Sequence, residues 1–314
     1  VFKHWNDNNN QDGMRPDSVV VTLLKNGVKT TKTMTLTAVN AWSGEFVNLD
    51  KYSNGVEVAY SIEEAKVDAY NLDASGQPQT VVASVVDGKI DITNTHVIEK
   101  TTMTAIKVWN DNNDQDGKRP ASIVLHLVSN GTHMGPEYKR VLTAETGWTA
   151  TWTDLDKYSG AELITYTVYE EPIVFDTDAA SEHAAPMAAD GYVPHYDRNS
   201  ASQITVTNTY VPETTDISVM KAWNDDDNRD GIRPASVTVN LLAGGKNTGK
   251  KLVLSEENGW AASWTDLPVY ENHGTAIIYT VEEETVPNGY TATVKAEGNQ
   301  FVLTNTHTPD VTNV

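Results

Sequence analysis

Cysteine is absent from the 314-residue chain. Its absence excludes disulfide bonds, cysteine-ligated zinc, iron–sulfur centres and thiol nucleophiles. Basic residues are also scarce, because 23 Lys and Arg stand against 43 Asp and Glu, for a net charge of −20. Such a chain repels nucleic acid and anionic membrane surfaces, so neither is an expected partner. Apolar runs are too short for the roughly 18 residues of a transmembrane helix, so no membrane insertion is predicted.

Four sequence blocks recur three times in the same order. The first, K-x-W-N-D…D-G-x-R-P, begins at Lys3, Lys107 and Lys221. A period of about 100 residues predicts three tandem globular domains, at 1–98, 99–211 and 212–314. Short polar links are expected at 97–102 and 211–215. Only two residues precede Lys3, so the first strand of domain 1 is expected to be truncated, and the chain to be a fragment of a longer one.

Apolar residues alternate with polar ones inside each domain. Val237, Val239 and Leu241, for example, are separated by Thr238 and Asn240. Period-two alternation, many Thr residues and turn residues about every ten positions predict an all-β fold of three tandem β-sandwich domains. Domain 2 carries an insert near 172–194, in which 179–189 is as consistent with a loop as with one short turn of helix.

Each domain aims a lysine, a glutamate and an asparagine at its own core. Side chains alternate across a strand, and Lys3 shares a face with Trp5, as Glu64 does with Ile62. The same parity selects Asn94 in domain 1, Lys107, Glu170 and Asn208 in domain 2, and Lys221, Glu283 and Asn305 in domain 3. The neighbouring Glu63, Glu171 and Glu282 are expected to face outward.

Three polar groups directed at one core are costly unless they meet, because a buried unpaired charge costs several kcal/mol. Burial lowers the pKa of a lysine and raises that of a glutamate, so both can become neutral. A neutral amine is a nucleophile, and a protonated glutamate can polarise the asparagine carbonyl. The product would be an amide between the two side chains, with loss of ammonia. The residues alone leave open a buried Lys–Glu ion pair capped by Asn, or side chains that face outward.

The motifs K-x-W-N-D…D-G-x-R-P, Y-[TS]-[VI]-x-E and T-N-T-[HY] together resemble the collagen-adhesin B-type repeat (Cna B-type domain) of Gram-positive surface proteins and pilins. The resemblance covers nearly the whole chain, three times. It implies a transthyretin-like or reverse-immunoglobulin sandwich with an intramolecular Lys–Asn isopeptide bond. Carried over by position, the bonds join Lys3 to Asn94, Lys107 to Asn208 and Lys221 to Asn305, assisted by Glu64, Glu170 and Glu283.

Two functions are consistent with this resemblance. The first is a stalk or spacer of an extracellular, cell-wall-anchored adhesin or pilus-like protein of a Gram-positive bacterium. It would be monomeric, need no cofactor and not be an enzyme, because crosslinking consumes its own side chains once. Binding to a host matrix protein or glycan would then belong to other regions of the full-length protein. In the second function, the domain 2 insert or the Trp148/Trp152 and Trp260/Trp264 pairs contact such a ligand.

Two weaker signals concern metals. The Asp-rich loops resemble the start of a calcium loop, but a full loop requires a Glu near the end of its roughly 12 residues, where Val19, Ile123 and Val237 stand. A turn that caps its own backbone is favoured. The calcium alternative rests on Asn112, Asp114, Asp116, Asp226, Asn228 and Asp230. His183 and His195 lack a short ligand spacing and are expected to be loop residues.

Overall fold

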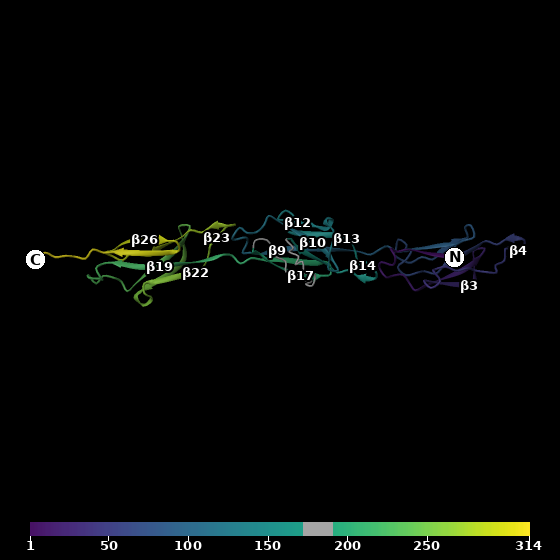
Figure 1. Cartoon of the computed structure of the whole chain (residues 1–314), viewed down its shortest axis with the longest axis horizontal. Coiled ribbons are helices and arrows are strands. Elements are labelled where there is room, and N and C mark those ends of the chain that lie inside the picture. Colours follow the sequence, from purple (N-terminus) through teal and green to yellow (C-terminus); the bar gives the residue numbers. More distant parts are fainter. Residues whose placement is uncertain (172–190) are drawn as a thin grey trace, which may run out of the picture.

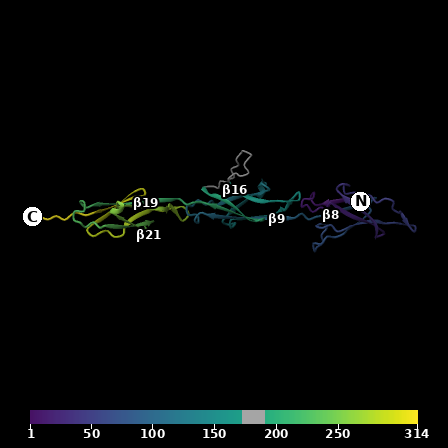
Figure 2. The same cartoon turned by 90° about the horizontal axis from the view of Figure 1, so that it is seen from below.

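The computed structural model describes residues 1–171 and 191–314 as three β units arranged in a row (Figure 1). The row is also extended in the perpendicular view (Figure 2). The described chain consists of strands, turns and short 3-10 helices, which confirms the predicted all-β fold. Most of the predicted insert, including His183 and 179–189, lies outside the described residues.

Unit 2 shows the sandwich most completely. One sheet has the strand order β13-β9-β18-β17, and the facing sheet joins β11, β12 and β16 to β10. The first and last strands, β9 and β18, lie side by side and run parallel. The elements are β9 (Lys100–Asn110), β10 (Ser122–Ser129), β11 (Thr132–His133), η1 (Pro136–Tyr138), β12 (Arg140–Thr143), β13 (Thr149–Asp156), β14 (Tyr158–Ser159), β15 (Glu162–Leu163), β16 (Tyr166–Glu170), β17 (Val193–Ser200) and β18 (Gln203–Thr209).

Unit 3 repeats this arrangement. Its sheets have the orders β22-β19-β27-β26 and β21-β20-β25, and β19 again runs parallel to the last strand, β27. The elements are β19 (Thr214–Asn224), β20 (Ser236–Ala243), β21 (Lys246–Ser255), η3 (Glu256–Asn258), β22 (Ala261–Pro268), β23 (Tyr270–Glu271), β24 (Thr275–Ala276), β25 (Tyr279–Glu283), β26 (Thr291–Glu297) and β27 (Gln300–Thr306).

Unit 1 departs from the other two at both ends of its sheets. Its first strand has five residues against eleven in β9 and β19, and it pairs with the last strand alone, as a two-stranded sheet β1-β8. β7 pairs with β6 in the facing sheet, whereas the corresponding strands of the other units, β17 and β26, pair with the last strands β18 and β27. The elements are β1 (Phe2–Asn6), β2 (Ser18–Lys25), β3 (Val28–Thr37), β4 (Tyr52–Ser53), β5 (Val56–Glu57), β6 (Tyr60–Glu64), β7 (Val81–Ser84) and β8 (Asp91–Thr95).

Each unit buries its own core, built by the alternation seen in the sequence. Val237, Val239 and Leu241 of β20 are all buried, and together they line one face of the strand. Full burial of an aliphatic side chain stabilises a fold by about 1.5–3 kcal/mol. The equivalent core residues are Val19, Val21 and Leu23 in unit 1, and Ile123, Leu125 and Leu127 in unit 2. Strand periodicity therefore fixes which side of each sheet is apolar.

Two local expectations were wrong. The predicted links 97–102 and 211–215 are partly strand, because Lys100 and Thr101 pair with β13 and Thr214 and Thr215 pair with β22. Trp148 and Trp260 do not share a strand face with Trp152 and Trp264. Each precedes its strand with a positive φ, 55° and 58°, after a glycine that is also left-handed. This turn tucks the indole against the core instead of displaying it in a stripe.

Neighbouring units are joined by a contact that occurs twice. The amide of Ala161, in the hairpin of unit 2, donates to the carbonyl of Gln11 in unit 1 at 2.9 Å. The amide of Gly274, in the hairpin of unit 3, donates to Gln115 of unit 2 at 3.0 Å. The hairpin β14–β15 or β23–β24 of one unit thus rests on the Asp-rich loop of the unit before it. In the described part of the chain, no helix has the length and apolarity to cross a bilayer.

Candidate functional site

The three candidate lysines lie on the first strand of each unit, beside the last strand. Lys107 of β9 is opposite Val206 of β18, and Trp109 is opposite Asn208. Asn208 is therefore the diagonal neighbour of Lys107 on the same face, two residues along the partner strand. The same register places Lys3 beside Asn94, and Lys221 beside Asn305. Parallel pairing of the first and last strands thus brings together the beginning and the end of each unit's sequence.

A glutamate of the facing sheet completes each group. Lys3 Nζ lies 3.8 Å from Glu64 Oε1, and Lys107 Nζ lies 3.5 Å from Glu170 Oε2. The amide of Asn208 donates to Glu170 Oε1 at 2.8 Å, and that of Asn305 to Glu283 Oε1 at 3.1 Å. The three lysines, the three asparagines, Glu64 and Glu170 are all at most 5% exposed, and Glu283 is half-buried. The structure places the nine side chains as three groups, which we call triads, with eight of the nine buried.

Burial shifts the ionisation of these groups toward neutrality. Desolvation lowers the pKa of Lys3, Lys107 and Lys221 to about 8, although the nearby glutamates oppose the shift. Desolvation also raises the pKa of Glu64, Glu170 and Glu283. At neutral pH, a larger share of each of these amines is therefore uncharged than in an exposed lysine. A buried neutral amine beside a carboxamide and a carboxyl group can attack the amide carbon.

Several buried atoms of the triads have no hydrogen-bond partner among the described residues. They include both carboxyl oxygens of Glu64, one each of Glu170 and Glu283, and the side-chain oxygens of Asn208 and Asn305. An unsatisfied buried polar atom costs about 1–3 kcal/mol. The polar groups of each triad are therefore only partly satisfied by one another.

An aromatic cluster covers each triad, and it was not found from the sequence. Lys107 Nζ lies 4.2 Å from the ring centroid of Trp109, which packs edge-on against Trp148 and Tyr192 at 5.1 Å. The carbonyl of Trp148 also accepts the amide of Lys107 at 2.8 Å. The left-handed turn at this tryptophan thus orients the lysine strand. The equivalent clusters are Trp5, Trp42 and Tyr70 in unit 1, and Trp223, Trp260 and Tyr290 in unit 3.

The Asp and Arg of the first motif form a clamp beside this cluster. Arg119 donates two hydrogen bonds to Asp111, at 2.9 and 2.6 Å, and the Tyr192 hydroxyl donates a third at 2.8 Å. Burial alone would raise the pKa of Asp111, but these hydrogen bonds lower it to about 2. The carboxylate is therefore charged at all ordinary pH values. The recurrence of Asp and Arg in the first block was the available signal for this clamp.

The calcium candidates of the Asp-rich loops have protein partners. Asp116 Oδ2 accepts the backbone amide of Glu213 at 2.7 Å, and Asp230 Oδ2 accepts that of Asp310 at 2.7 Å. Asp114 and Asn228 each accept an arginine amide from within their own loop, at 2.8 and 2.9 Å, while Asn112 and Asp226 contact Gln115 and Arg229. Across residues 1–171 and 191–314, no group of three or more His, Asp or Glu side chains is arranged to hold a metal ion.

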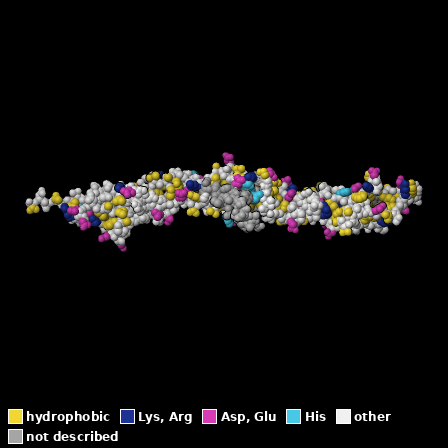
Figure 3. Space-filling view, in the orientation of Figure 1, with side chains coloured by type: hydrophobic (Ala, Val, Ile, Leu, Met, Phe, Trp, Pro, Cys, Tyr) yellow, Lys and Arg dark blue, Asp and Glu magenta, His cyan; other side chains and the backbone are white. Residues whose placement is uncertain are grey.

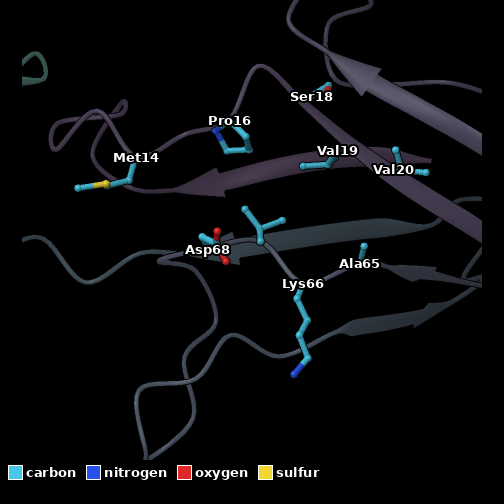
Figure 4. Close-up of a pocket in the computed structure, with 9 residues that line it drawn as sticks. Met14, Pro16, Ser18, Val19, Val20, Ala65, Lys66 and Asp68 are labelled. Atoms are coloured by element: carbon cyan, nitrogen blue, oxygen red, sulfur yellow. The ribbon is translucent and has the colours of Figure 1, made fainter.

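The remaining candidate residues and the groove of unit 1 lie apart from the triads. The expectation that His195 lies in a loop was wrong, because it lies on β17, where it is exposed and contacts Asp197 of the same strand. Trp152 and Trp264 are buried in their cores, so they cannot stack on a sugar. A groove of about 370 Å³ in unit 1 lies between Pro16 and Val19 on one side and 65–68 on the other (Figure 4). The Lys66 side chain extends away from Val19, and the groove is separate from the triad.

Comparison with known proteins gives consistent matches. The model of the Cna protein B-type domain family matches residues 1–95, 103–209 and 217–306. A collagen adhesin of Staphylococcus aureus is 38% identical over 310 residues, 99% of this chain, which spans 23% of that protein. A crystal structure of two B repeat units of the collagen binding protein of S. aureus is 35% identical, with a TM-score of 0.50, and the match covers 98% of this chain and 74% of that one. A single B repeat unit of that protein is 36% identical, with a TM-score of 0.30, over 67% of this chain and all of that one.

Proposed function

The chain belongs to the Cna protein B-type domain family, and we propose that it is a spacer segment of a Gram-positive surface adhesin, stiffened by one Lys–Asn isopeptide bond in each unit. Domains of this family are structural and not enzymatic. The observation that carries the proposal is the threefold recurrence of a buried Lys and Asn at the junction of the first and last strands, with a Glu of the facing sheet beside them.

The bond would form by a single condensation in each unit. In unit 2, the neutral Nζ of Lys107 attacks Cγ of Asn208, and the Cγ–Nδ2 bond breaks. Glu170 presents one carboxyl oxygen to the amine and the other to the amide nitrogen, so it can accept a proton from the attacking nitrogen and deliver it to the leaving one. Ammonia departs, and an amide replaces the amine and carboxamide. The same roles fall to the corresponding residues of units 1 and 3.

The row of units supports the spacer function. Each link is tied to the loop of the preceding unit, because Asp12 accepts the amide of Glu99 and Asp116 accepts that of Glu213, both at 2.7 Å. Acidic side chains are spread along the face shown in Figure 3, and the net charge of −20 opposes collapse of the row. These features favour an extended segment that separates whatever lies at its two ends.

We further propose that this segment acts outside the cell, on the surface of a Gram-positive bacterium, anchored through the cell wall. The S. aureus relative is named a collagen adhesin, and this chain matches less than a quarter of it. Binding of a host matrix protein or glycan is therefore assigned to other regions of the full-length protein. The buried tryptophans do not favour the alternative in which these units themselves bind a sugar.

A pair of glycines tests whether the contact between units keeps the row straight. Gly117 and Gly231 occupy equivalent loop positions with φ of 67° and 69°. A Cβ at Gly117 would lie 2.6 Å from the carbonyl oxygen of His273 in the next unit, whereas a Cβ at Gly231 would meet nothing within 4 Å. Gly117→Ala is expected to push away the β23–β24 hairpin and loosen the junction of units 2 and 3. Gly231→Ala carries the same backbone strain and is the matched control.

The measurement is the distance distribution between two spin labels, on Val141→Cys in unit 2 and Val253→Cys in unit 3. Both positions are exposed, and the chain has no other cysteine to label. A narrow distribution is expected for the parent and for Gly231→Ala, and a broad one for Gly117→Ala. Identical distributions in the two glycine variants would show that this contact does not stiffen the row.

A further inference from the structure

Unit 1 has an asparagine where the other two units have a paired strand residue. Tyr70, Tyr192 and Tyr290 occupy equivalent places, each donating to the Asp of its clamp. In units 2 and 3 the next residue begins β17 or β26 and pairs with the last strand. In unit 1 it is Asn71, with a left-handed φ of 47°. Its amide still donates to the carbonyl of Thr95 on the last strand at 2.9 Å, but the chain then turns away, because β7 joins the other sheet.

The hydrogen bonds of Asn71 fix the orientation of both amide groups at this site. Its Oδ1 accepts the backbone amide of Thr95 at 2.9 Å, and a backbone N–H can only donate. The other terminal atom of Asn71 is therefore the NH2 group, and it donates to Asn94 Oδ1 at 2.7 Å. Because that atom of Asn94 accepts, it is the carbonyl oxygen. The leaving nitrogen of Asn94 is its other terminal atom, which is buried and makes no hydrogen bond to the described residues.

We propose that Asn71 is an additional catalytic residue of unit 1, which stabilises the oxygen of Asn94 during isopeptide formation. This inference rests on the proposed crosslinking function. When Nζ of Lys3 bonds to Cγ of Asn94, negative charge moves onto Oδ1, where the Asn71 amide already donates a hydrogen bond. Glu64 then transfers a proton from Nζ to Nδ2, the Cγ–Nδ2 bond breaks, and ammonia leaves. Oxygen stabilisation and proton transfer thus fall to different residues.

The other two units do not share this arrangement. Val193 and Thr291 occupy the position of Asn71, and neither side chain donates to the asparagine of its triad. Within the described ranges, Oδ1 of Asn208 and of Asn305 has no hydrogen-bond donor. Unit 1 has the shortest first strand and the smallest sheet around its triad, and Asn71 provides there a donor that units 2 and 3 lack.

Two variants distinguish the hydrogen bond that Asn71 donates to Asn94 from the one that it accepts from Thr95. Asn71→Asp keeps an oxygen for the amide of Thr95 but removes the donor to Asn94. Asn71→Gly removes the whole side chain and tolerates the positive φ. The full chain is made by cell-free synthesis, synthesis is stopped, and samples are quenched in acid at intervals. Peptide masses after proteolysis then give the crosslinked fraction of each unit, with units 2 and 3 as internal controls.

Both variants are expected to slow bond formation in unit 1 by about 10²-fold, the usual effect of losing one such donor, and to leave units 2 and 3 unchanged. Slow formation that still reaches completion would show that unit 1 is folded. An unchanged rate in Asn71→Asp, with or without slowing in Asn71→Gly, would overturn the catalytic role. A parent chain crosslinked in units 2 and 3 but not in unit 1 would also overturn it. A parent with no bond in any unit would overturn the proposed function as well.

Discussion

Stretched from its two ends, the unaltered chain is expected to lengthen little, whereas Lys107→Ala should release about 340 Å of chain from unit 2. The reason is the position of the proposed bond, between parallel first and last strands. A pull on the ends enters at β9 and leaves at β18, so a covalent bond from Lys107 to Asn208 would carry the force past the rest of the unit. The segment between them would stay folded and bear no load. Without the bond it unfolds, and the 101 steps from Lys107 to Asn208, at roughly 3.4 Å each, account for the released length.

Single-molecule pulling of Lys107→Ala and Lys221→Ala measures this directly. Lys221→Ala should release about 290 Å, because Asn305 lies 84 positions after Lys221. Each variant leaves the other units as internal controls. By analogy with a disulfide, closing a loop of this length also stabilises a unit by about 4–5 kcal/mol, so heating and protease should distinguish the same variants. Full-length unravelling of units 2 and 3 in the unaltered chain would rule out the force-bearing role.

Glu170→Gln is expected to leave unit 2 folded and without its crosslink. Gln has nearly the same shape as Glu but cannot carry a proton from Lys107 to Asn208, so the condensation should stop. The intact chain should then lack two ammonia molecules, roughly 17 Da each, where the parent lacks three. Glu283→Gln should have the same effect in unit 3.

Glu171→Gln is the matched control for this experiment. Glu171 follows Glu170 in the sequence but faces outward, half-exposed, where it pairs with Lys139 at 2.8 Å. Its substitution should leave all three crosslinks in place. Full ammonia loss in Glu170→Gln, or failure of the unit 2 crosslink in Glu171→Gln, would show that the wrong carboxylate has been assigned.

Strand parity and repetition predict which polar side chains face the core. Lys107, Glu170 and Asn208 each alternate with core residues of their own strands, and the same pattern occurs three times, so their inward direction could be read without any long-range information. The pairing that brings Lys107 to Asn208 could be anticipated only from the family resemblance, because residues so far apart in sequence have no local signal for contact.

Features that depend on backbone turns were not predicted. The spacing of Trp148 and Trp152 fits period two and favours a shared strand face, but a left-handed turn places Trp148 in the aromatic cluster. Asn71 was not singled out, since its role follows from the exchange of β7 to the other sheet, a choice between two long-range pairings. The Asp-rich loop is predicted as a turn that caps its own backbone, and Asp111 does accept the amide of Asp114. Residue types alone do not show that Asp111 also binds the side chain of Arg119.

The intact mass of the unaltered chain tests the central claim most directly. Each Lys–Asn bond expels one ammonia, so three bonds predict a mass about 51 Da below that of the sequence, at roughly 17 Da per bond. Proteolytic peptides should place the losses at Lys3–Asn94, Lys107–Asn208 and Lys221–Asn305. A mass equal to that of the unmodified sequence would contradict the account, and the triads would then be buried polar networks and not sites of crosslinking.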